Sequence, residues 1–123
     1  RIDTWNEIPT KQQEDIIGRT KCQNIEYPSA EKHAFSHTKR TNLKNGLGEP
    51  IEILRQSMPY GTMRVQGLFF ISLCNDPNPF KQMLKSMIEG DGRGQYDRLL
   101  NYTQAETGAA FFAPSIEFLK RFL

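Results

Sequence analysis

The feature that most constrains this chain is the apolar run GLFFISLC at residues 67–74, which holds one hydroxyl group and no charge. An apolar run of this length is typical of a strand that is buried on both faces. Residues 51–57 alternate instead, with Ile51, Ile53 and Arg55 on one side. This alternation predicts a second strand. We therefore expect the chain to fold around a small sheet.

Helices are predicted around these strands. The clearest covers residues 78–88, where apolar residues recur at helical spacing and form one stripe. Asn78 is expected to cap this helix, with Pro79 at its first position and Gly90 after its end. The other expected elements are helices over 1–20 (with a Thr10–Gln13 capping box), 96–101 and 115–123, a turn at 58–61 and a strand at 109–113. This order is typical of an α+β domain, a small sheet with helices on one face.

Residues 21–50 form a polar stretch with little periodicity, and a compact domain seldom contains so long a loop without a function. His37 lies within it, among several lysines. From the pattern alone, His37 is open to three interpretations: a metal or haem ligand, part of an anion- or nucleic-acid-binding segment at 32–44, or a solvated loop residue. The 16 basic and 14 acidic residues give a charge of +2, which argues against nucleic acid as a partner.

Arg55 lies on the side of its strand that is expected to be buried. A guanidinium does not lose its proton, so a buried arginine requires an anionic partner. The alternative is a strand-end arginine that reaches water. Carboxylates such as Asp97 indicate no more than turn chemistry when taken alone.

The two cysteines and the longest apolar run bear on cellular location. Cys22 and Cys74 lack metal-ligand spacing and are expected to be reduced thiols of a cytoplasmic protein. The apolar run at 67–74 is too short to cross a membrane, so we expect no membrane partner.

Several short stretches together resemble, in order, the C-terminal half of the dye-decolorizing (DyP-type) haem peroxidases. They are Ile17–Lys21, Ser36–His37 with Arg40 and Asn42, Ile53–Gly61, Gly67–Phe70, Met83–Met87, Tyr96–Leu100, and Thr107–Gly108 through Phe112–Ser115. Each piece is short, but their shared order across about 100 residues makes the resemblance specific.

The resemblance implies roles on the proximal side of a haem. His37 matches the ligand of the haem iron, with haem b (iron protoporphyrin IX) as the expected cofactor. Asp97 matches the acidic partner of that histidine, and Arg19 matches an arginine at the haem propionates. A carboxylate behind a ligating imidazole raises the basicity of the ligand.

The resemblance also implies roles on the distal side. Arg55 matches the distal arginine, and Ser57 matches a distal polar position that is serine or asparagine in the family. Phe70 matches an apolar residue at the haem face. A fixed cation there stabilises the negative charge that develops as the peroxide O–O bond breaks.

As a fold, the resemblance implies a ferredoxin-like antiparallel sheet, the second half of a two-domain dimeric α+β barrel-type peroxidase. Residues 1–123 would be its C-terminal haem-binding domain. In the family, the aspartate of a Gly-x-x-Asp-Gly motif handles the peroxide proton. This motif is missing from these 123 residues, because the residue three positions before Asp91–Gly92 is Ile88 and not glycine. We therefore expect the N-terminal half to lie outside this sequence, and the chain alone to have little activity.

The expected function of the whole protein is peroxidase activity, in which hydrogen peroxide oxidises dyes, phenols or other small-molecule electron donors. A homo-oligomer is expected as well. The alternative is a non-catalytic ferredoxin-like module for binding or dimerisation.

Overall fold

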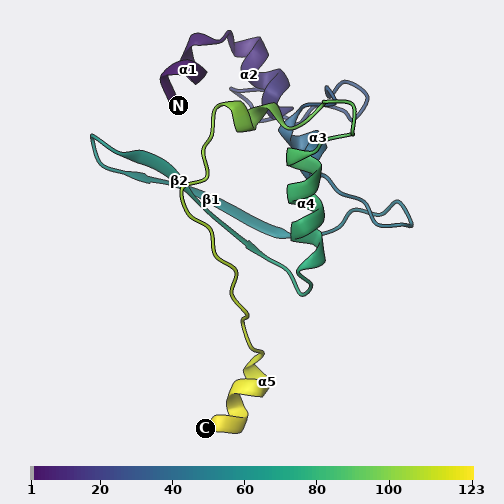
Figure 1. Cartoon of the computed structure of the whole chain (residues 1–123), viewed down its shortest axis with the longest axis vertical. Helices are drawn as coiled ribbons and strands as arrows, with labels where there is room; N and C mark the ends of the chain where they lie inside the picture. The colour runs from purple at the N-terminus through teal and green to yellow at the C-terminus, as the bar shows by residue number, and fades with distance from the viewer. Residues whose placement is uncertain (1) are drawn as a thin grey trace.

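The computed structural model describes residues 2–123, which form a small α+β structure with a two-stranded sheet. Figure 1 shows α1 and α2 at one end, the hairpin crossing the middle, and the last helix at the end of an extended segment. In chain order the elements are α1 (Ile2–Glu7), α2 (Thr10–Ile17), α3 (His37–Thr41), β1 (Leu54–Gly61), β2 (Gln66–Leu73), α4 (Asn78–Ile88), the 3₁₀ helix η1 (Arg98–Asn101), α5 (Ile116–Leu119) and the 3₁₀ helix η2 (Lys120–Phe122).

The two strands form an antiparallel hairpin in which Ser57 pairs with Phe70 and Arg55 with Ser72. Since side chains alternate along a strand and paired residues share a face, Arg55, Ser57 and Phe70 lie on the same face. The predicted strand at 67–74 is confirmed, but its predicted burial is wrong. Phe69 and Phe70 are each 53% exposed, because no third strand or second layer covers this sheet within residues 2–123.

Two further predictions along the sheet are wrong. The turn expected at 58–61 lies inside β1, and the chain reverses at 62–65, where the Thr62 amide donates to the Val65 carbonyl over 2.7 Å. Pro59 fits within β1 because both strands of a hairpin are edge strands, so its missing N–H costs no obligatory ladder bond. The strand expected at 109–113 is an extended segment without a strand partner, leading to α5 (Figure 1).

The N-terminal helices follow the prediction except at the start of α2. Gly18 ends α2 in the left-handed conformation (φ +85°), and a Cβ there would lie 2.1 Å from the Thr38 hydroxyl oxygen, so glycine is required. The predicted capping box is wrong. The N-cap is Pro9, and the side-chain amide of Gln13 donates instead to the Trp5 and Ile8 carbonyls.

Helix α4 matches its predicted range, although Asn78 lies inside the helix rather than at its cap. Gly90 follows its end with φ +69°. Only Met83 of the apolar stripe is buried, where α4 packs against α3. The predicted loop at 21–50 is wrong in one respect, since it contains the helix α3. Within residues 2–123, no helix combines the length and the apolar character that crossing a membrane requires.

Candidate functional site

A histidine–aspartate pair joins two segments that lie 60 residues apart in the sequence. His37 is the first residue of α3 and Asp97 is the N-cap of η1. The two atoms His37 Nδ1 and Asp97 Oδ2 are 2.7 Å apart. The Asp97 side chain is fully buried, and its other oxygen accepts a hydrogen bond from the Leu99 amide over 3.0 Å. A carboxylate accepts, so Nδ1 carries a proton and donates it in the hydrogen bond, and Nε2 is the ring nitrogen that could bind a metal ion.

The side chain of His37 is one-third exposed, and it lines a cavity of about 440 Å³. The cavity brings together five of the six residues singled out in the sequence, and Asp97 lies behind the imidazole. The lining residues are Arg19, Glu26, His37, Thr38, Thr41, Asn42, Arg55, Gln56, Ser57 and Phe70. The segment that follows α2, the helix α3 and both strands of the hairpin therefore meet around one hollow.

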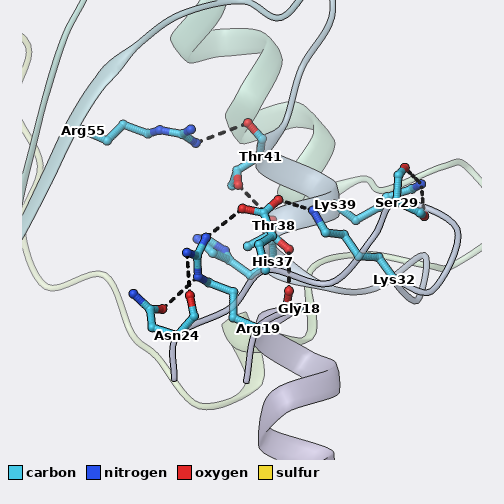
Figure 2. A network of polar contacts seen from close by, with 11 residues as sticks. Gly18, Arg19, Asn24, Ser29, Lys32, His37, Thr38, Lys39, Thr41 and Arg55 are labelled. Atoms are coloured by element: carbon cyan, nitrogen blue, oxygen red, sulfur yellow. Dashed lines mark hydrogen bonds and ion pairs between the residues drawn. The ribbon is translucent and has the colours of Figure 1, made fainter. Parts of the chain in front are cut away.

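Arg55 reaches this cavity from β1 and is exposed, so the face of β1 that was expected to be buried is not buried. The exposure of Arg55 agrees with the alternative of a strand arginine that reaches water. The bare hairpin explains the difference, because no layer covers the face on which Arg55 lies. Its guanidinium donates to the Thr41 carbonyl over 3.3 Å, as Figure 2 shows, and lies 3.9 Å from the Met83 sulfur. Among residues 2–123 it has no carboxylate partner, so its charge stays available to an anion in the cavity.

Arg19 is held in place by a polar network (Figure 2). Its guanidinium donates to Glu26 over 2.7 Å, and to the Asn24 side chain and carbonyl over 2.8 and 2.9 Å. Three of its five N–H groups are thus used, and two remain for a ligand. Glu26 also accepts from Lys32, whose side chain is almost fully buried. Lys32 and, to a smaller extent, Arg19 hold the pKa of Glu26 below its ordinary value of 4.5.

Replacing Lys32 with methionine is expected to raise the pKa of Glu26 back toward its ordinary value. Because the pKa is lowered in the folded chain, the Glu26 ion pairs stabilise the fold above about pH 4.5, and this contribution is lost as the pH falls through the lower folded-state pKa. K32M should therefore lower the unfolding free energy at pH 7 and flatten its decline toward pH 3. Urea unfolding at several pH values measures this free energy, with K81M, at an exposed position of α4, as the control. An identical pH dependence in K32M and the unsubstituted chain would contradict the assignment.

Several residues that line the cavity were not predicted from the sequence. Glu26 carries no signal in its spacing, because a β-bridge with Arg19 brings it to the cavity. Thr38 and Thr41 could have been found had α3 been predicted, since residues spaced like His37, Thr38 and Thr41 lie close on one side of a helix. Asn42 belonged to the resembling stretch at 36–42, but no role was assigned to it there.

The site offers one imidazole as a metal ligand, which suits a metal ion whose other ligands come from a cofactor. Nowhere in residues 2–123 do three or more His, Cys, Asp or Glu side chains gather so as to hold a metal ion themselves. A single imidazole backed by a carboxylate would supply one protein ligand to haem iron, the cationic side chains would pair with the haem carboxylates, and Phe70 would face the apolar ring. The residues present therefore fit haem, and the site has the composition of a haem-binding α+β domain.

Comparison with known families agrees with this class. The family model "Dyp-type peroxidase, C-terminal" matches residues 1–118. The chain therefore belongs to the Dyp-type peroxidase family and corresponds to the C-terminal part of its members.

Relatives and solved structures give the same result. A dye-decolorizing peroxidase of Rhodococcus erythropolis is 40% identical over 120 residues, which are 96% of this chain and 35% of the relative. A crystal structure of a DyP-type peroxidase protein from Shewanella oneidensis is 56% identical with a TM-score of 0.92, covering 98% of this chain and 39% of that one. A variant of DypB from Rhodococcus jostii RHA1 in complex with heme is 33% identical with a TM-score of 0.77, covering 82% and 33%.

The chain thus spans about a third of the length of the curated relatives that it matches. The likeness to solved peroxidases confirms the predicted ferredoxin-like α+β class.

Proposed function

We propose that this chain supplies the haem-ligating part of a DyP-type peroxidase, which uses hydrogen peroxide to oxidise dyes, phenols or other small electron donors. The observation that carries the proposal is the His37–Asp97 pair at the cavity that Arg19, Arg55, Ser57 and Phe70 also line. Family membership supports it and does not favour the alternative of a non-catalytic binding module.

His37 is proposed as the residue that would bind the iron of haem b, through Nε2. When bound, the haem supplies an iron that reacts with hydrogen peroxide and is then reduced by the electron donor. Asp97 accepts a hydrogen bond from the Nδ1–H of His37, which fixes the tautomer and makes the imidazole a stronger donor to the metal. The two N–H groups of Arg19 that the network leaves free are proposed to bind a haem propionate.

The hairpin side of the cavity is proposed to handle peroxide. Arg55 places a permanent cation beside the cavity, where it stabilises negative charge that develops on a peroxide oxygen. Ser57 shares its face of the sheet, and its hydroxyl can donate to or accept from the same oxygen. Phe70, paired with Ser57, offers an apolar surface to the porphyrin ring.

Titrating the chain with hemin tests the proposal. We expect the Soret absorption to saturate at one hemin per chain, while dye oxidation with hydrogen peroxide stays slow because the Gly-x-x-Asp-Gly aspartate is missing from these 123 residues. Hemin binding that does not saturate would instead favour the non-catalytic module. The homo-oligomeric state and the cytoplasmic location stay predictions.

A further inference from the structure

Arg98 joins the two segments that carry the histidine–aspartate pair. It follows Asp97 directly, and its guanidinium carbon lies 3.9 Å from the centroid of the Phe35 ring, two residues before His37. The Arg98 amide also donates to the Phe35 carbonyl over 3.2 Å. One residue thus contacts both the backbone and the ring of Phe35, immediately beside the Nδ1–Oδ2 hydrogen bond.

The partner segment is itself fixed on the side of α2. The fully buried Ser36 hydroxyl donates to the Asp15 carbonyl over 2.5 Å. The segment 33–36 is therefore tied to α2 by Ser36 and to η1 by Arg98.

The charge of Arg98 is directed at this ring rather than at a carboxylate. Arg98 is exposed, and it forms no ion pair within the part of the chain that the structure describes. A cation over an aromatic ring is attracted by the negative face of the ring. Asp97, in contrast, is anchored independently, because its amide donates to the Met87 carbonyl over 2.9 Å and its side chain accepts from Leu99. The position of His37 relative to Asp97 therefore depends on how the Phe35 segment is held.

We propose that Arg98 is a positioning residue: its guanidinium, stacked on Phe35, holds His37 Nδ1 against the buried Asp97 carboxylate and so sets the tautomer and the donor strength of the imidazole. The contact acts through Phe35 and does not require Arg98 to touch a ligand. The part concerning donor strength toward iron rests on the proposed function, whereas the part concerning the tautomer does not.

The test uses the chain labelled with ¹⁵N-histidine and the variants R98M and R98K. In the unsubstituted chain we expect one His37 tautomer, protonated at Nδ1, with a hydrogen-bonded ring proton. In R98M we expect that proton to exchange with water roughly two- to fivefold faster, the factor that an exposed cation–π contact corresponds to. R98K keeps a cation over the ring and should lie between the two. R93M, which removes an exposed arginine outside the stack, is the control.

A second measurement uses the hemin-loaded chain in its ferrous form. In R98M the Fe–His stretching band should move to lower frequency, because a weaker hydrogen bond to Asp97 makes His37 a weaker donor. Unchanged ring signals and exchange in R98M, or an equal change in R93M, would overturn the proposal. If R98M does not fold, R98K serves as the test, because lysine lacks the flat stacking surface of guanidinium. A His37 ring proton that exchanges in R98K as slowly as in the unsubstituted chain would then overturn the proposal. Faster exchange in R98M without any Fe–His band would keep the positioning role and refute the haem assignment instead.

Discussion

The substitution His37→Ala is expected to abolish specific haem binding by this chain. The imidazole is the proposed metal donor, and His37 is the only histidine among the described residues that line the cavity. Hemin titration followed at the Soret band measures the effect, and we expect saturable binding to be lost. The substitution His33→Ala is the matched control, since His33 lies four positions earlier in the same segment and stacks on Phe35 rather than lining the cavity.

Chemical rescue separates a ligand from a structural residue. His37→Gly removes the imidazole while leaving room beside Asp97, so adding free imidazole should restore saturable hemin binding to this variant. An unchanged Soret titration in His37→Ala would contradict the assignment. So would an equal loss of binding in His33→Ala.

The substitution Arg55→Leu is expected to slow the reaction of the hemin-loaded chain with hydrogen peroxide by a factor of about 10²–10³. The guanidinium is fixed at the cavity by the Thr41 carbonyl and forms no ion pair within the described chain, so its charge can act on a peroxide oxygen. Hemin affinity should stay within a few-fold, because Arg55 is not the proposed metal ligand. Stopped-flow absorption after mixing with peroxide measures the rate.

Two variants control this prediction. Arg55→Lys keeps a charge but loses the planar guanidinium, and should fall between the two rates. Arg64→Leu removes an exposed arginine from the turn between the strands and should react like the unsubstituted chain. Equal rates for Arg55→Leu and Arg64→Leu would show that Arg55 does not act on peroxide.

The sequence predicts the elements better than it predicts their surroundings. The apolar stripe locates α4, with an error of one residue at its start, because helical spacing is a local property. The burial of the 67–74 strand is not local: it depends on which layer covers the sheet, and residues 2–123 supply none. Met58–Gly61 is typical of a turn by composition, yet an edge strand accommodates Pro59, so pairing with β2 prevails.

The site shows the same division. Spacing alone could not bring His37 to Asp97, because the contact depends on the packing of α3 beside η1. Only the resemblance to a family paired His37 with Asp97. It also placed a further set of residues at the same site, namely Arg19, Arg55, Ser57 and Phe70. Glu26 escaped both approaches, since a bridge with Arg19 inside an irregular segment brings it to the cavity.

The resonance Raman spectrum of the ferrous, hemin-loaded chain tests the central claim most directly. If His37 ligates the iron, a chain made with ¹⁵N-histidine should show an Fe–His stretching band at lower frequency than the unlabelled chain. This band should persist in His33→Ala and disappear in His37→Ala. An isotope-sensitive band that survives in His37→Ala, or none in the unsubstituted chain, would contradict the account.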